Sequence, residues 1–221
     1  RRAGEHPQRH QRRQIAHQAG GEQRQRSDHH AGTKQPPIAQ SIDYRAHQQV
    51  WMGAQGPDGV MWFGNSHSVI SYDGATWRRI NVPGTSWIRA LAFGQDQRLY
   101  VGGTDQLGFI APGPDGAPRF TSLLDKLPTA HRASGVIWSM AAARDAVWFA
   151  TESLVLRWQR GDFRAWSFTN HSRQYLQRVG DELFLHRQGV GLFQFAGDDF
   201  TLVTEAPEVA GSQFCLIERL E

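Results

Sequence analysis

Short apolar segments and turn residues alternate along the chain from about residue 49 onward. In the stretch GVMWFGNSHSVISYDGATW (59–77), an aromatic segment ends at Gly64, a second apolar segment covers Val69–Tyr72, and Asp73-Gly74 precedes Trp77. Asp-Gly readily adopts the positive φ angles that tight hairpins need, and strands of about four to six residues are ordinary in antiparallel sheets. The pattern predicts a series of short strands joined by tight turns.

This pattern recurs along the chain. Each repeat is centred on an aromatic residue, and these residues, roughly 35 to 50 positions apart, are Trp62, Tyr100, Trp148 and Phe184. A repeat contains about four short apolar segments, which is typical of one blade of a β-propeller. The aromatic side chains are expected to fill the space between neighbouring sheets. Three leucines before Pro128, at 123, 124 and 127, predict a short helical turn between the second and third repeats.

We therefore predict an all-β fold, a β-propeller segment of about four four-stranded antiparallel blades. The propeller is expected to cover residues 42–221, with blades at 49–82, 87–122, 135–168 and 174–204 and the start of a fifth at 212–221. Four blades are the lower limit for a closed propeller, so we expect an incomplete ring that belongs to a longer protein.

Residues 1–40 have a different composition. They contain no Leu, Val, Phe, Trp, Tyr or Met, whereas Arg, Gln and His are abundant. Such a segment cannot bury enough apolar surface to offset the entropy of ordering, which predicts disorder. A linker, or a stretch foreign to the folded protein, is favoured over an arginine-rich nucleic-acid arm or a loose metal site at His29-His30.

Charge and cysteine content exclude some classes of function. The chain has a net charge of +3 and a pI of about 9.4, but the basic excess lies in the first 50 residues, so no nucleic-acid partner is predicted for the propeller. The single cysteine, Cys215, excludes an internal disulfide. No apolar run reaches the length of a membrane helix, and no signal peptide is recognisable.

Several stretches resemble a known family. MWFGNSHSVISYDGATWRRI (61–80), LYVGGTDQLGFI (99–110), FTSLLDKLP (120–128) and IDYRAHQQVW (42–51) are similar to repeats of the two-component regulator propeller family, and the resemblance covers about residues 42–203. It implies a periplasmic or extracytoplasmic sensor of a bacterial signalling receptor. Its partners would be the remainder of the propeller and a downstream kinase, diguanylate cyclase or DNA-binding output domain. No motif of such an output domain occurs in these 221 residues.

The sequence carries no recognisable catalytic motif. It has no Gly-x-Ser-x-Gly elbow and no phosphate-binding loop, and the body lacks the spacing of metal-binding histidines. Asp58, Asp96 and Asp145 each precede a second strand, where turn formation is favoured over calcium binding. We therefore predict no enzyme activity, no cofactor and no metal. A propeller lyase or glycosidase is the least favoured alternative, with Asp105 and Glu152 as its only candidate carboxylates.

Propellers mostly bind ligands on the face formed by the loops between second and third strands and the loops between blades. The candidate ligand-binding residues on this face are Asn65, Ser66, His67, Thr104, Asp105, Gln106, Thr151, Glu152 and Arg187. Their polar side chains suit a polar small molecule or an oligosaccharide. The main prediction is therefore a non-catalytic ligand-binding sensor, and a protein-interaction propeller of another family is the alternative.

Overall fold

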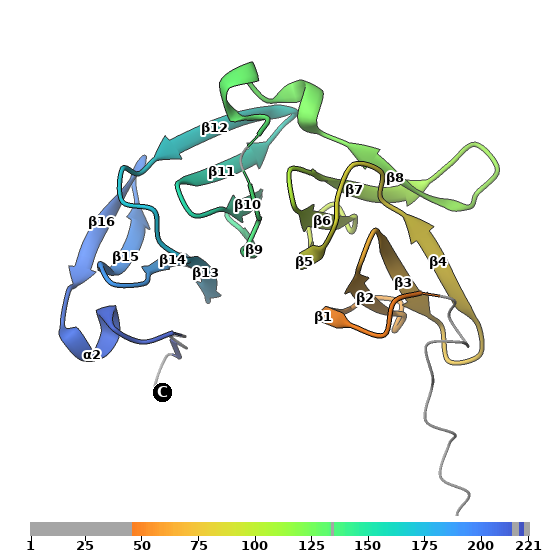
Figure 1. The fold of residues 1–221 in the computed structure, drawn as a ribbon, viewed down its shortest axis with the longest axis horizontal. Helices are drawn as coiled ribbons and strands as arrows, with labels where there is room; N and C mark the ends of the chain where they lie inside the picture. Colours follow the sequence, from red (N-terminus) through yellow and green to blue (C-terminus); the bar gives the residue numbers. More distant parts are fainter. Residues whose placement is uncertain (1–45, 134, 214–216, 219–221) are drawn as a thin grey trace, which may run out of the picture. The chain divides into compact units, whose positions relative to one another are not determined.

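The computed structural model describes residues 46–133, 135–213 and 217–218. The disorder predicted for residues 1–40 lies outside this part of the chain. The described residues form four antiparallel sheets with the strands in chain order (Figure 1). The first two sheets are β1 (Val50–Gln55), β2 (Met61–Asn65), β3 (Ser68–Tyr72) and β4 (Trp77–Asn81), then β5 (Ile88–Phe93), β6 (Leu99–Gly103), β7 (Leu107–Pro112) and β8 (Pro118–Ser122). The other two are β9 (Ser139–Ala143), β10 (Ala146–Ala150), β11 (Leu154–Gln159) and β12 (Asp162–Ser167), then β13 (Gln174–Val179), β14 (Glu182–Arg187), β15 (Gly191–Ala196) and β16 (Asp199–Thr204).

Tight turns connect the strands within each sheet, as the sequence predicts. In the first blade Gly74 adopts φ 96° between β3 and β4, in the left-handed region that favours glycine. In the third blade Arg144 and Asp145 take this conformation at φ 53° and 56° and form a two-residue hairpin between β9 and β10. Asp145 is thus part of a turn.

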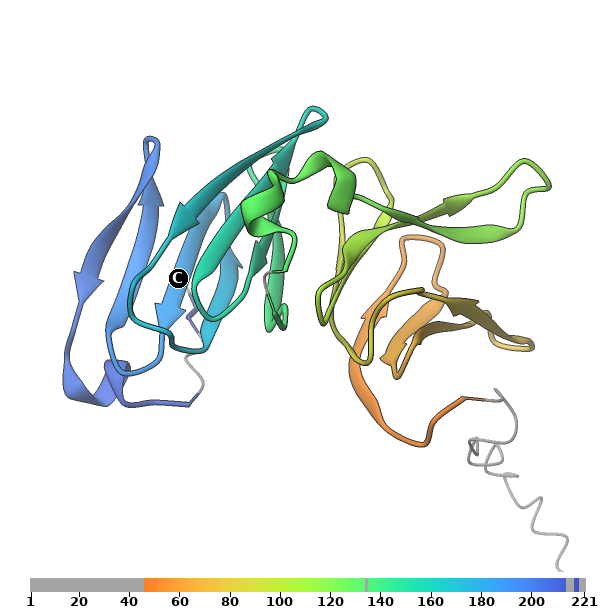
Figure 2. The same cartoon turned by 45° about the horizontal axis from the view of Figure 1, so that its top comes forward.

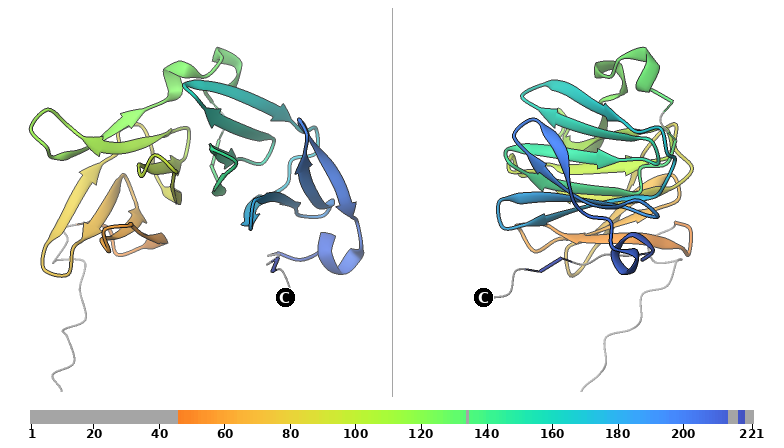
Figure 3. Two further views of the ribbon diagram at one scale, coloured as in Figure 1. Left: turned by 180° about the vertical axis from the view of Figure 1, so that it is seen from behind. Right: turned by 90° about the vertical axis from the view of Figure 1, so that its left-hand side faces the viewer.

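The four sheets pack against one another in sequence. The first strand of each sheet contacts the first strand of the next, so β1 meets β5, β5 meets β9 and β9 meets β13. These first strands lie innermost and β4, β8, β12 and β16 lie outermost (Figures 1 and 3). The fourth sheet does not come round to meet the first (Figure 1). The described residues therefore form an incomplete β-propeller of four blades, which confirms the predicted fold class.

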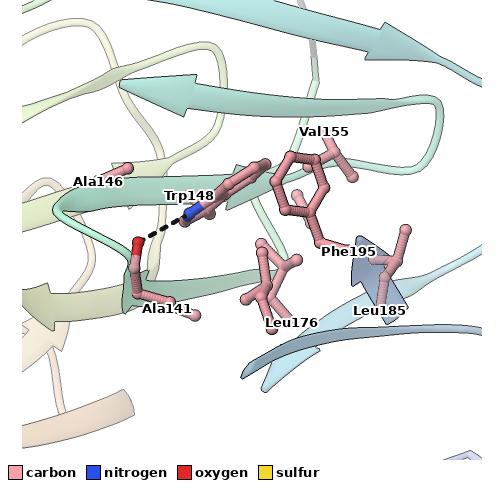
Figure 4. Close-up of a cluster of buried hydrophobic side chains, with 10 residues drawn as sticks. Ala141, Ala146, Trp148, Val155, Leu176, Leu185 and Phe195 are labelled. Atoms are coloured by element: carbon pink, nitrogen blue, oxygen red, sulfur yellow. Dashed lines mark hydrogen bonds between the residues drawn. The ribbon is translucent and has the colours of Figure 1, made fainter. Parts of the chain in front are cut away.

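Aromatic residues fill the spaces between blades. Trp148 of β10 is fully buried against Phe195 of the fourth blade, with ring centroids 4.6 Å apart (Figure 4). Its indole N–H donates to the carbonyl oxygen of Ala143 at 3.2 Å, so the polar atom of the ring is satisfied. Separate apolar clusters lie between the first and second blades, around Ile88, and between the second and third, around Phe149.

Glycine allows a close approach between the first two blades. Gly64 of β2 packs on the backbone of Ile88 in β5, and an added Cβ would lie 2.7 Å from the Ile88 carbonyl oxygen. Gly102 of β6 is similar, since a Cβ there would lie 2.6 Å from Cγ2 of Ile137. Glycine at the end of the second strand thus allows a following segment of the chain to pack closely on it, β5 on Gly64 and the segment before β9 on Gly102.

The segment between the second and third blades contains the predicted helical turn. Two 3-10 turns, η1 (Leu124–Lys126) and η2 (Thr129–His131), cross from β8 toward β9 (Figure 2). The first strand of the third blade begins at Ser139, later than the start of the predicted blade at 135. Val136 instead forms an isolated bridge to Thr104, and the Ile137 N–H donates to Gly103, so this segment pairs with the second blade first.

The predicted start of a fifth blade (212–221) lies largely outside the described residues. A one-turn helix, α2 (Pro207–Ala210), follows β16. Further along, the Gln177 side chain of β13 exchanges two hydrogen bonds with the backbone of Ile217, at 2.6 Å and 3.0 Å. The chain after the fourth blade therefore returns to the inner strand of that blade.

Candidate functional site

The loop after β2 holds three of the predicted site residues. Asn65 is fully buried, and its amide nitrogen donates to the carbonyl oxygens of His47 and Gln49, both at 2.6 Å, so this side chain fixes the chain before β1. His67 is exposed at φ 61°, and its Nδ1 lies 2.6 Å from the carbonyl oxygen of Thr85. Ser66 and His67 contribute to a cavity of about 550 Å³, whose other lining residues are Ala46, His47, Ser68, Arg79, Asn81 and Trp87.

The loop after β6 joins the second blade to the segment that leads to the third. Asp105 is exposed, and its carboxylate accepts the Gly135 N–H at 2.8 Å, while its own N–H donates to the Gly135 carbonyl oxygen at 2.9 Å. Thr104 is half-buried beside it. Gln106 is buried, and its amide donates to Pro83 at 2.9 Å and accepts from Ser122 at 2.7 Å. Asp105 and Gln106 therefore connect neighbouring segments of the chain by hydrogen bonds.

The remaining predicted residues lie in the third and fourth blades. Thr151 is fully buried, and its hydroxyl caps its own turn by accepting the Leu154 N–H at 3.0 Å. Glu152 is exposed on that turn. Arg187 is only 6% exposed; it donates to the Asn170 carbonyl oxygen at 3.0 Å and lies 4.1 Å from the centre of the Phe168 ring. Burial lowers the pKa of its guanidinium.

The nine predicted residues thus divide into two groups. Asn65, Gln106, Thr151 and Arg187 are buried and stabilise loops. The more accessible residues are Ser66, His67, Thr104, Asp105 and Glu152, and of these only Ser66 and His67 line a described cavity together. Ligand binding by these residues stays a prediction.

A cluster that the sequence reasoning missed lies where the inner strands begin. It consists of Trp51, Trp87, Arg89, Trp138 and Arg173, here called the Trp–Arg cluster. The Arg89 guanidinium carbon lies 4.1, 4.8 and 5.2 Å from the ring centres of Trp51, Trp138 and Trp87. The Arg173 guanidinium carbon lies 4.6 Å from the same Trp138 ring. The cluster therefore joins all four blades at the beginning of their inner strands.

Two β-bulges explain how this cluster forms. The pairing of β1 with β2 shifts between Val50 and Met52, and that of β5 with β6 shifts between Ile88 and Ala90. Trp51 and Arg89 are the extra residues at these shifts. A bulge re-aims the side chain of its extra residue, and here it brings equivalent positions of two blades together.

The cluster is positively charged and lacks a counter-ion within the described chain. No ion pair within 4.0 Å involves Arg89 or Arg173 among the residues that the structure describes. Burial lowers the pKa of the Arg89 guanidinium, and the like charge of Arg173 lowers it further. Cation–π contact with three indole rings is the stabilisation that Arg89 has in place of a carboxylate.

The sequence does contain a signal for this cluster. A Trp or Arg occurs at or just before the first strand of every repeat: VW at 50–51, SWIR at 86–89, VIW at 136–138 and SR at 172–173. The predicted ligand-binding residues lie in other loops, mainly those between second and third strands, and include none of these residues.

A second cavity, of about 540 Å³, lies between turns of the second and third blades and is lined in part by Asp96, Tyr100, Asp145 and Trp158. The Tyr100 hydroxyl donates to Asp96 at 2.9 Å. Burial, together with this contact, raises the pKa of Tyr100 to about 12. Tyr100 is therefore a neutral hydrogen-bond donor at ordinary pH.

Within the described part of the chain, no three His, Cys, Asp or Glu side chains gather as metal ligands would. A helix long and apolar enough to cross a membrane is likewise not found there.

Solved structures with the same architecture include two bacterial proteins of different kinds. A virginiamycin B lyase from Staphylococcus aureus has a TM-score of 0.56 and 18% identity over 71% of this chain and 56% of the lyase. The extracellular domain of a putative one-component system from B. thetaiotaomicron has a TM-score of 0.54 and 17% identity over 70% of this chain and 21% of that domain. This chain thus spans about half of the lyase and a fifth of the extracellular domain.

A third match, the computationally designed protein Ika8, has a TM-score of 0.51 and 17% identity over 67% of this chain and 46% of the designed protein. No protein-family model matches the chain, and no curated protein does. At these identities the likeness establishes the β-propeller fold alone.

Proposed function

We propose that this chain is the ligand-binding part of a bacterial sensor propeller that acts outside the cytoplasm and passes its signal to an output domain elsewhere in the receptor. The observation that carries the proposal is the Trp–Arg cluster. One exposed and two half-buried indole rings, with two arginines that have no carboxylate partner, gather where several blades meet, and this is the composition of a ligand site. A propeller core needs neither feature.

The likeness to an extracellular domain of a putative one-component system supports the sensor role and the compartment. It agrees with the repeat motif at 61–80, which resembles sensor propellers of two-component systems. The likeness to a lyase does not favour catalysis here, because Asp105, one of two candidate carboxylates, is engaged by the Gly135 N–H. The proposal is therefore a binding function without catalysis.

A protein-interaction role has weaker support. The large apolar side chains that are most exposed among the described residues are Val50, Met52, Trp87, Leu202 and Val203, and Trp87 is the only aromatic one. Leu202 and Val203 lie on the outermost strand β16, whereas Val50 and Met52 lie on the innermost strand β1. They do not form the single aromatic face that a protein partner would need.

A ligand screen tests the proposal. The protein would be titrated with a panel of neutral and charged oligosaccharides, amino acids and aromatic acids, with thermal stability and tryptophan fluorescence as readouts. We expect at least one compound to raise the melting temperature and change the fluorescence of the wild type. The same compound should have a weaker effect on Trp87→Ala, whose 43% exposed ring is accessible to a ligand. A panel without any binder would refute the proposal.

A further inference from the structure

The Trp–Arg cluster also indicates what kind of ligand it takes, an inference that rests on the proposed binding function. Two cations share one indole ring, since Arg89 and Arg173 both lie within 5 Å of the centre of Trp138. Their like charges repel, as the lowered pKa of Arg89 reflects, and no carboxylate of the described residues lies within 4.0 Å of either guanidinium. A bound anion would remove this repulsion, whereas a neutral ligand would not.

The unsatisfied polar atoms of the cluster point to the same chemistry. The Arg89 Nε and the indole nitrogens of Trp51 and Trp138 are buried and have no hydrogen-bond partner among the described residues. All three are N–H donors, and none can accept a hydrogen bond. The missing partner is therefore an acceptor, and oxyanions are the strongest acceptors for guanidinium groups.

The indole rings add a requirement for shape. Trp87 is 43% exposed and lies 6.3 Å from Trp51, with 55° between the ring planes. Two aromatic planes at this angle form an angled apolar surface beside the cations, and each ring of it is flat. Since a guanidinium donates in its own plane, stacking on indoles leaves its N–H edge available for a bidentate acceptor.

We propose that the Trp–Arg cluster binds a carboxylate carried on a ring with a flat apolar face. Arg89 and Arg173 hold the carboxylate, and Trp87 together with Trp51 packs against the ring. Two sources share this chemistry: an aromatic carboxylic acid and a sugar acid.

Two pairs of probes separate charge from shape. Naphthoate is compared with naphthamide, and an oligogalacturonate with the neutral galactose oligomer of the same length. Affinities are measured by isothermal titration calorimetry of the full chain at low salt. We expect the charged member of at least one pair to bind about tenfold tighter than the neutral member, and added salt to reduce the difference. The pair that shows it identifies the source of the carboxylate.

Variants that remove one arginine charge then test whether the charged probe binds at the Trp–Arg cluster. Arg173 is exposed, so Arg173→Gln leaves the fold unchanged, and we expect it to abolish most of the preference for the charged probe. Arg89→Gln should do the same, and Arg89→Lys should recover only part of it because lysine lacks the planar fork. The matched control is Arg178→Gln. It makes the same charge change on the inner strand β13, beyond the cluster, where Arg178 bonds Gly180. The control should keep the preference of the wild type.

Equal affinity for charged and neutral probes would overturn the inference while leaving a ligand-binding function intact. An equal loss of preference in Arg178→Gln and Arg173→Gln would also overturn it, because the preference would then arise from overall charge. If none of these probes binds but the wider panel contains a neutral binder, the carboxylate assignment fails alone. If no compound of the wider panel binds either, the proposed ligand-binding function is refuted as well.

Discussion

Replacing Gly64 with alanine adds one methyl group where the first blade meets the second. The new Cβ would lie 2.7 Å from the carbonyl oxygen and 3.1 Å from Cγ2 of Ile88, whereas ordinary contacts of this kind span 3.4–4 Å. The carbonyl belongs to the backbone of β5, so it cannot rotate away as a flexible side chain could. The two blades must therefore separate by several tenths of an ångström around a buried contact.

Overpacking of this kind costs about 1–3 kcal/mol of unfolding free energy. The matched control is Gly53→Ala in β1 of the same sheet. A Cβ there would lie 3.6 Å from the Phe63 ring, in ordinary contact. Alanine at a compatible position stabilises by about 0.4–1 kcal/mol, because it reduces the freedom of the unfolded chain. The two variants should therefore differ by about 2 kcal/mol or more, with opposite signs relative to the wild type.

Urea denaturation followed by circular dichroism and tryptophan fluorescence measures this difference. The midpoint of Gly64→Ala should move to lower urea at an unchanged slope, and that of Gly53→Ala should stay or move higher. If Gly64→Ala unfolds at the same urea concentration as Gly53→Ala, β2 and β5 can separate without lowering the free energy of unfolding. The close approach would then not be a constraint on the packing of blades.

Two further predictions concern the interior. Trp148→Ala should lower the unfolding free energy by about 3–5 kcal/mol, since it empties a fully buried site between blades, whereas Trp87→Ala should cost far less in the same denaturation assay. Because burial and Asp96 raise the pKa of Tyr100 from 10.0 to about 12, its stabilisation is complete below pH 10 and is lost as the pH rises through about 12. Tyr100→Phe should therefore lose less stability than the wild type over this range, and parallel pH profiles would contradict the assignment.

The blades were predictable because each of them is a local pattern. Trp62, Tyr100, Trp148 and Phe184 mark equivalent positions of the four second strands, and turn residues such as Asp73-Gly74 mark the hairpins. Both signals act within a few residues, so no long-range information is needed. The exception is the start of the third blade, where the first strand begins only at Ser139.

That exception has a physical cause. The sequence around Val136–Trp138 is apolar and reads as a strand, but Val136 bridges to Thr104 and the Ile137 N–H donates to Gly103, both in the second blade. Pairing with the third blade begins only at Trp138, whose N–H donates to Ala150. Which sheet this segment pairs with depends on its position in space after the loop that contains η1 and η2. Tertiary contacts determine this pairing, so the residues of the segment itself do not reveal it.

The candidate site was harder to predict for a related reason. Strand alternation assigns each side chain to one face, and a bulge changes this assignment for the extra residue. Trp51 and Arg89 are such residues, so counting along the strand gives the wrong neighbours for both. Conversely, Asn65 and Thr151 are among the predicted ligand-binding residues, yet their side chains hydrogen-bond backbone groups of the chain itself.

The tryptophans therefore serve two different purposes in one repeat. On the second strand, Trp148 is fully buried and its N–H is satisfied by Ala143, so it contributes to the stability of the fold. At the start of the first strand, Trp51 and Trp138 keep N–H groups without partners and surround an arginine without a counter-ion. Unsatisfied donors and unpaired cations reduce stability, and they are found together mainly where a ligand supplies the missing acceptor. The buried indole N–H of Trp62 on β2 also lacks a partner, so unsatisfied indoles alone do not distinguish the two positions. The combination of such indoles with two arginines that have no counter-ion among the described residues is the physical reason to place binding at the beginning of the inner strands.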